Sequence, residues 1–189
     1  TDFVPVRDVA AIGVAVVAIA TVRRKNVTFD LLGPAIGAIG LIAAAVHATD
    51  GAGNISTNLL RVAVGTVFLG AISDAMLLGH WYLVQPGMPR SILNELVDAL
   101  RWILPIEIVV MLIPTGMISV LTGAVDDGWN GTLGWFWVAC AVTTAVLIEV
   151  TRAALRERSY SAVMAATGLL YLAILTAFGT DLVARAVLA

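Results

Sequence analysis

The sequence has few of the residues on which disulfides, metal clusters and charged binding surfaces depend. It contains one cysteine, Cys140, and two histidines among 189 residues. An internal disulfide, a cysteine-ligated zinc site and an iron–sulfur cluster are therefore excluded. Only 13% of the residues are charged and the formal net charge is −2, so no basic surface for nucleic acid is expected. The sequence also lacks a nucleotide-binding glycine motif, a P-loop, HExxH and GxSxG.

What the chain has in abundance is apolar residues, which make up 60% of it, whereas a soluble domain has about half. A helix that crosses a bilayer needs roughly 20 mostly apolar residues, and six segments approach this. They lack the period-two alternation of barrel strands. We therefore predict an all-α, polytopic integral membrane bundle that forms one transmembrane domain, residues 1–189, with no soluble domain. The predicted helices are residues 5–22, 31–48, 59–84, 92–121, 133–150 and 162–182.

The distribution of basic residues predicts how the chain is oriented, because cytoplasmic loops carry an excess of Lys and Arg. Seven basic residues lie on one side of the six predicted helices: Arg23, Arg24, Lys25, Arg90, Arg152, Arg156 and Arg158. Three lie on the other side: Arg7, Arg61 and Arg185. We predict a multi-pass protein of the plasma (inner) membrane, with both termini outside and residues 85–91 in the cytoplasm.

Two of the predicted helices carry a special pattern. The second has small residues at spacings of three and four (Gly33, Gly37, Gly40, Ala44), which predicts close packing within the chain. The fourth is about 30 residues long and begins with an amphipathic stretch, "SILNELVDALRW". We expect Ser91 to cap it. We also expect a bend near Pro105 or Pro114.

Charged residues inside a membrane helix are costly and are usually paired or functional. Four are candidates: Asp74, Arg101, Glu107 and Glu149. Asp74 and Arg101 each lie ten residues from the predicted turn between the third and fourth helices, about 15 Å along each helix. A buried Asp74–Arg101 pair is expected, either as a structural clamp or as a functional group. Glu107 lies deeper without an obvious partner, and Glu149 is expected to pair with Arg152 three residues on.

The stretch "LLGHWYLVQPGMPRS" (residues 77–91) collects polar and aromatic side chains near the predicted cytoplasmic surface. Trp81 and Tyr82 suit the headgroup level of a bilayer, where an apolar ring and a polar tip are both accommodated. His80, Asp98, Arg101 and Asp74 could form a polar ladder into the membrane. Such a ladder suits a quinone headgroup, a proton path or a partner chain, while a solvated histidine is the alternative interpretation of His80.

Other ligands and loops carry weaker signals. His47 and His80 lie on opposite sides of the predicted bundle, so a haem held by two histidines is not expected, nor is a covalently bound cofactor or a metal site. In the loop "GAVDDGWNGTLGWFW" the aromatic residues Trp129, Trp135, Phe136 and Trp137 are expected to be interfacial anchors. The adjacent Asp126 and Asp127 could bind a cation or a basic partner.

These observations favour a non-catalytic membrane subunit of a larger complex, respiratory and quinone-linked. Its partners would be the lipid bilayer and other membrane subunits. The contact residues for a quinone or a partner are His80, Trp81, Tyr82, Asp98 and Arg101. The alternative function is a small transporter or channel that uses Asp74, Arg101 and Glu107. A membrane-embedded lipid enzyme is disfavoured, because no clustered nucleophile, base or metal ligands are present.

Overall fold

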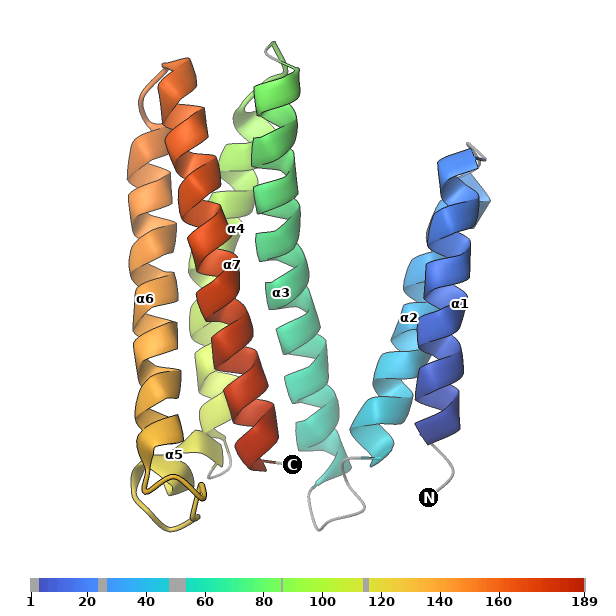
Figure 1. Ribbon diagram of the computed structural model, residues 1–189, viewed down its shortest axis with the longest axis vertical. Helices are drawn as coiled ribbons and strands as arrows, with labels where there is room; N and C mark the ends of the chain where they lie inside the picture. Colours follow the sequence, from blue (N-terminus) through green and yellow to red (C-terminus); the bar gives the residue numbers. More distant parts are fainter. Residues whose placement is uncertain (1–3, 24–26, 48–53, 86, 114–115, 189) are drawn as a thin grey trace. The chain divides into compact units, whose positions relative to one another are not determined.

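The computed structural model describes residues 4–23, 27–47, 54–85, 87–113 and 116–188. Within these ranges the chain is all-helical and has no β-strand, as the long apolar runs predict. The described helices are α1 (Val4–Arg23), α2 (Val27–His47), α3 (Ile55–Val84), α4 (Ser91–Leu112), α5 (Gly116–Leu121), α6 (Thr132–Leu155) and α7 (Tyr160–Leu188) (Figure 1). Among these, α1, α2, α3, α6 and α7 are long and apolar enough to cross a membrane.

The predicted fourth helix, residues 92–121, is divided in two. Helix α4 ends at Leu112 and the short α5 begins at Gly116. Ile113 is extended (φ −93°, ψ 144°), which is the conformation that a residue before a proline prefers. Pro105 lies inside α4, and Pro114 lies outside the described residues. The chain thus breaks beside the second of the two prolines at which a bend was expected.

The start of α4 follows the predicted amphipathic pattern. Leu93, Val97 and Leu100 are buried, whereas Asn94 and Asp98 on the other face are exposed. The expected Ser91 cap is wrong. Ser91 is already helical, the N-cap residue is Arg90, and no side chain bonds at the cap.

Residues 1–63 form one compact unit, in which α1 packs on α2. The small residues of α2 make this contact. A methyl group built at Gly37 would lie 3.7 Å from Val14, and one at Gly40 would lie 2.8 Å from Cβ of Ala10. The second distance is shorter than two methyl groups allow, so α1 approaches α2 as closely as it does because position 40 has no side chain. The predicted intramolecular packing of this stripe is confirmed.

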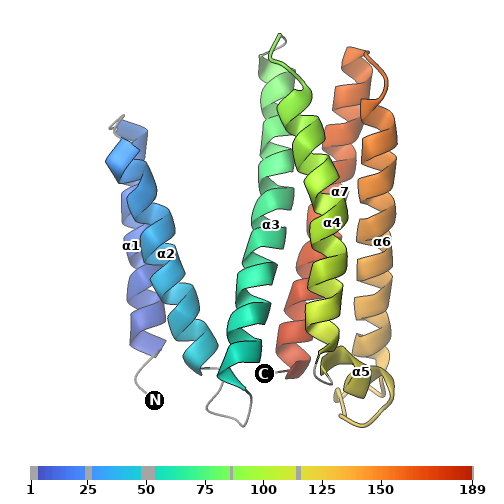
Figure 2. The same cartoon turned by 180° about the vertical axis from the view of Figure 1, so that it is seen from behind.

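Residues 64–189 form the second compact unit, which holds the rest of α3 together with α4 to α7. The α3–α4 and α6–α7 turns lie at one end, and α5 with the loop before α6 lies at the other (Figures 1 and 2). One apolar core joins α3, α4, α6 and α7, and a second lies toward the α5 end. The second core contains Met111, Met117, Val120, Trp137, Val183 and Ala184.

The polar and aromatic stretch after Gly79 holds the α3–α4 turn. Tyr82 is buried, and its hydroxyl donates to the carbonyl of Pro89. Trp81 is 57% exposed, and its indole N–H donates to Gln85 at 2.9 Å. The turn is also joined to the α6–α7 connection, because Tyr160 donates to the carbonyl of Leu83 at 3.0 Å. Only Trp81 of the expected aromatic pair therefore faces outward, since Tyr82 closes the turn from within.

The aromatic residues at and before the start of α6 also differ in exposure. Trp129, Trp135 and Phe136 are exposed, as interfacial anchors would be, but Trp137 is only 3% exposed. The expectation for Trp137 is wrong because the helical period aligns it with Gly134 and Ala141 on the buried face of α6.

The carboxylate of Asp127 caps the start of α6, although Asp127 lies five residues before the first residue of the helix, Thr132. Its carboxylate accepts hydrogen bonds from the backbone N–H groups of Trp129, Gly131 and Leu133 at 2.8–2.9 Å. Desolvation by itself would raise the pKa of Asp127. These backbone donors outweigh it, so the pKa lies below its ordinary value. The carboxylate is thus engaged by the chain, and the cation or basic partner expected for it competes with the cap.

We predict that Asp127→Asn destabilises the chain more than Asp126→Asn, because Asp126 accepts one described backbone bond, from Gly128. The folded pKa of Asp127 is depressed, so its contribution is present above the unfolded pKa and is lost as the pH falls through the folded value. Thermal unfolding in detergent should show a weaker acid dependence in Asp127→Asn than in the native chain. An unchanged acid dependence would contradict this role.

Candidate functional site

The expected pair of Asp74 with Arg101 is wrong. Arg101 instead forms an ion pair with Glu149 of α6, with Nε and Oε1 2.7 Å apart. Asp74 is exposed on α3. The depth argument placed both residues at the same level, but it could not say which way each side chain points around its helix axis.

Two ion pairs instead join α4 to α6. Asp98 contacts Arg152, with Oδ1 and Nε 2.5 Å apart, one helical turn from the contact of Arg101 with Glu149. Each helix carries one acidic and one basic residue at a spacing of three. Because the two helices run in opposite directions (Figure 2), the acidic residue of each faces the basic residue of the other. The pairing of Glu149 with Arg152 expected from their spacing is therefore replaced by two contacts between helices.

The five residues predicted to contact a quinone or a partner occupy three environments. Asp98 and Arg101 pair with α6, and Tyr82 is buried in the turn. His80 and Trp81 are exposed on α3. The continuous ladder from His80 through Asp98 and Arg101 to Asp74 is therefore not formed.

Six of the exposed residues of α3 form one face, which we call the α3 outer face: Val67, Gly70, Asp74, Leu77, His80 and Trp81. The spacing from Val67 to Trp81 alternates between three and four, so these residues align along one side of the helix. A methyl group built at Gly70 would meet no atom within 4 Å. The face thus combines an open glycine, a carboxylate and a histidine.

Glu107 is the one predicted intramembrane residue that the structure buries completely, with a relative exposure of 0%. Both of its carboxyl oxygens are buried and make no hydrogen bond with any described residue. Its position follows from the period of α4, on which Leu104, Glu107 and Met111 share the buried face. Burial of a lone carboxylate costs several kcal/mol, so such a group is protonated or compensated by a neighbour.

Asp181 and Arg185 of α7 lie beside Glu107. They form an ion pair with Nε and Oδ2 2.7 Å apart, and Asp181 is only 7% exposed. A methyl group built at Gly65 of α3 would lie 2.7 Å from Nη2 of Arg185, 2.8 Å from Oδ1 of Asp181 and 3.4 Å from Oε1 of Glu107. Two carboxyl groups and one guanidinium thus converge on a glycine that leaves room for them. We call these residues the Glu107 cluster.

The Glu107 cluster holds more acidic than basic groups, because Arg185 is paired with Asp181 and Glu107 has no ion-pair partner among the described residues. Oδ1 of Asp181, like both oxygens of Glu107, has no hydrogen-bond partner among the described residues. The sequence analysis found Glu107 but not Asp181. The available signal was an acidic residue four positions before an arginine in an apolar helix, the spacing that places both on one face.

Within the described ranges, no group of three or more His, Cys, Asp or Glu side chains is arranged to hold a metal ion. Comparison with protein-family models, with curated proteins and with solved structures found no match to this chain. The function proposed below therefore rests on the residues of this chain alone.

We predict that Arg101→Gln and Glu149→Gln each destabilise the bundle and that their effects are coupled by about 1 kcal/mol, the upper range for partly exposed pairs. The exchanged pair, Arg101→Glu with Glu149→Arg, should recover most of the loss. Denaturant unfolding in mixed micelles measures these free energies.

The control cycle combines Asp74→Asn with Arg101→Gln, for which strictly additive effects are expected. Coupling in the control cycle would show that Arg101 interacts with Asp74. Additivity between positions 101 and 149 would show that Arg101 does not interact with Glu149.

Proposed function

We propose that this chain is an integral membrane subunit of a larger complex and that the α3 outer face contacts a partner helix. The observation that carries the proposal is the exposure of Asp74 in the middle of an apolar helix. Asp74 lies ten residues before Val84, the last residue of α3, about 15 Å into the span. A charged residue at the centre of a membrane helix costs about 2.5–3.5 kcal/mol on insertion scales, so it rarely faces lipid.

Among the described residues, the carboxylate of Asp74 has no ion-pair partner. Arg101 is engaged by Glu149, and the central residues of α1 and α2, 8–22 and 31–46, include no Lys, Arg or His. A donor from a partner helix is the compensation that this proposal assigns to Asp74. Gly70, one turn away, lets a second helix approach closely, and interfaces between membrane helices favour such small and polar residues.

In this proposal α4 is the sixth membrane span. Its 22 residues cover about 33 Å as a helix, enough for the hydrocarbon core. It is not among the five most apolar helices, because it carries Glu95, Asp98, Arg101 and Glu107. Two of these charges are paired with α6 and Glu107 is buried, which lowers their cost in lipid.

The respiratory role proposed for the complex places a quinone headgroup at the end of the α3 outer face. His80 and Trp81 are exposed there, four residues or fewer from the end of α3. The indole of Trp81 offers a flat apolar surface against which a quinone ring can stack, and the imidazole of His80 offers an N–H donor for a quinone carbonyl. Asp98, Arg101 and Tyr82 belong to other contacts, so they leave the proposed ligand set.

Photo-crosslinking in native membranes tests the α3 outer face. A crosslinking residue at Gly70 or Leu77 should join the chain to a defined neighbouring protein, because a partner helix covers these positions. The matched control is Leu175 of α7, which is 63% exposed and should yield lipid adducts only. Gly70→Trp should abolish co-purification of the same neighbour, whereas Leu175→Trp should not.

Two results would contradict the proposal. One is equal crosslinking at positions 70 and 175, and the other is purification of the chain alone from native membranes under mild conditions. The quinone is tested separately in the isolated complex, where His80→Ala should lower quinone-linked turnover and leave assembly unchanged. Full turnover in His80→Ala would contradict a quinone site on the α3 outer face, but it would not contradict the contact of this face with a partner helix.

The Glu107 cluster favours a second candidate function, a proton-coupled transporter or channel. Of the three residues expected to serve such a path, Asp74 and Arg101 are exposed and only Glu107 is buried. With Asp181 beside it, Glu107 forms an acidic pair inside the unit of residues 64–189, and ionisable residues inside a membrane bundle commonly mark a proton relay.

Vesicles that contain the chain alone test the second function. Proton flux driven by a pH gradient, measured with an entrapped dye, should be lost in Glu107→Gln and retained in Glu107→Asp. Glu149→Gln is the control for the loss of a carboxylate outside the cluster. If the native chain shows no more flux than empty vesicles, the transporter function is wrong and the cluster is a structural element.

A further inference from the structure

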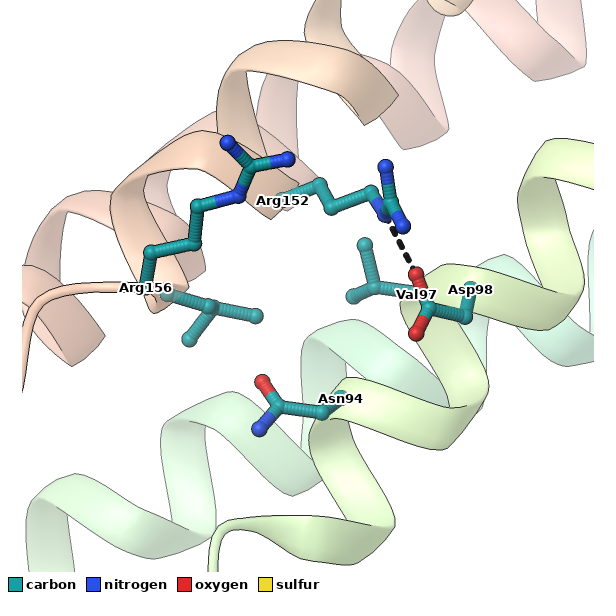
Figure 3. A pocket seen from close by; sticks show the side chains of 6 residues that line it. Asn94, Val97, Asp98, Arg152 and Arg156 are labelled. Carbon is teal, nitrogen blue, oxygen red and sulfur yellow. Dashed lines mark hydrogen bonds and ion pairs between the residues drawn. The ribbon is translucent and has the colours of Figure 1, made fainter.

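We propose that the cavity between the start of α4 and the end of α6 binds the phosphate group of an anionic membrane phospholipid. The cavity has a volume of about 210 Å³ and is lined by Asn94, Val97, Asp98, Arg152, Leu155 and Arg156. The guanidinium groups of Arg152 in α6 and of Arg156 directly after it stand on one side of the cavity, and Asn94 and Asp98 of α4 stand on the other (Figure 3). This site is separate from the α3 outer face and from the Glu107 cluster.

The charges around the cavity favour an anion. Asp98 is held by Arg152 at 2.5 Å, so these two largely neutralise each other. Arg156 follows the last residue of α6, and no carboxylate among the described residues lies within 4 Å of it. Its guanidinium therefore supplies a net positive charge and a fork of N–H donors that matches two oxygens of a phosphate.

The side chain of Asn94 adds a neutral donor on the α4 side of the cavity. Its amide N–H₂ group can donate to an anion oxygen. The backbone N–H of Asn94 is already bonded to the carbonyl of Arg90 at 3.1 Å, so only the side chain is available. An anion in the cavity would thus meet two arginines and an amide, against one carboxylate that is already paired.

The floor of the cavity is rigid and apolar. Val97 is 1% exposed and Leu155 is 7% exposed, and both belong to the main core of residues 64–189. Asn94, Asp98 and Arg152 are carried by the packed helices α4 and α6, and Arg156 is carried by the turn directly after α6. The volume is smaller than that of drug-sized ligand sites, about 300–1,000 Å³, and suits a small polar group.

The place of the cavity in the fold points to a lipid as the source of the phosphate. It lies where the α3–α4 and α6–α7 connections meet, among Arg90, Arg152, Arg156 and Arg158, which belong to the predicted cytoplasmic excess of basic residues. In the predicted topology these connections lie at the cytoplasmic membrane surface, which is the level of the lipid phosphate groups. Basic pockets between membrane helices on the cytoplasmic side bind anionic headgroups. The lipid chains would extend along the apolar surface of the helices.

The test uses the whole chain, purified and stripped of lipid, with phosphatidylglycerol, phosphatidylcholine or inorganic phosphate added. Phosphatidylglycerol should raise the unfolding temperature and remain bound in native mass spectra, and phosphatidylcholine should do neither. Arg156→Gln should weaken phosphatidylglycerol binding about tenfold, as the loss of one charge-assisted contact implies. Arg158→Gln, which removes a nearby arginine that does not line the cavity, should bind as the native chain does.

Each other result decides against the proposal. If Arg156→Gln binds phosphatidylglycerol as tightly as the native chain, or if Arg158→Gln weakens binding equally, the cavity is not the site. If inorganic phosphate stabilises the native chain as strongly as the lipid and Arg156→Gln removes both effects, the cavity takes free phosphate. Because Arg156 is exposed, its replacement should leave the fold intact, and an unchanged unfolding temperature without lipid verifies this.

Discussion

The two ion pairs between α4 and α6 are the polar contacts that select the register of these two helices. The hydrophobic effect is not directional, and interdigitated apolar side chains can pack in more than one register. Two opposite charges on each helix tolerate a shift of register less well, because the shift separates both ion pairs. The contacts of Asp98 with Arg152 and of Arg101 with Glu149 form together only when α4 stands at one height and one rotation relative to α6.

The position of Glu107 follows from that register. With Arg101 turned toward Glu149, the helical period rotates position 107 by six residues, about 240°, so Glu107 points elsewhere. It points into the bundle, toward Asp181 of α7 and Gly65 of α3. The partly exposed ion pair of Arg101 with Glu149 lies on one side of α4, and the buried carboxyl group of Glu107 therefore lies on another side. This explains how a helix with four charged residues packs among helices that are almost wholly apolar.

Much of this architecture could be predicted from the sequence because hydrophobic length and small-residue spacing are local signals. They predicted the long helices and the packing of the small-residue stripe of α2 within the chain, and the period of apolar residues predicted the amphipathic start of α4. The two prolines predicted a bend near Pro105 or Pro114, and α4 ends at Leu112, close to the second of these prolines. The partner of Arg101 could not be predicted, because distance from a turn gives the depth of a residue and not its direction around the axis. Helix α3 is apolar on nearly all sides, so it has no polar face from which to infer that Asp74 points outward. The burial of Tyr82 and Trp137 was also not predicted. Composition suggests a belt of exposed aromatic residues, but the position of each ring around its packed helix decides whether it is buried.

One rule governs all three charged residues on which the functional arguments depend. A charge in a medium of low dielectric constant must be compensated, by an opposite charge, by a proton or by a partner from outside. Arg101 is compensated inside the chain by Glu149, and it therefore needs no further role. Glu107 is enclosed, so its compensation has to come from a proton or from Arg185, which Asp181 already engages. Asp74 is exposed within the unit of residues 64–189 and has no ion-pair partner among the described residues, and so the proposed partner helix is the compensation that fits it. The same energetic cost therefore supports both proposals, proton exchange at the buried Glu107 and assembly at the exposed Asp74, and the two are compatible in one protein.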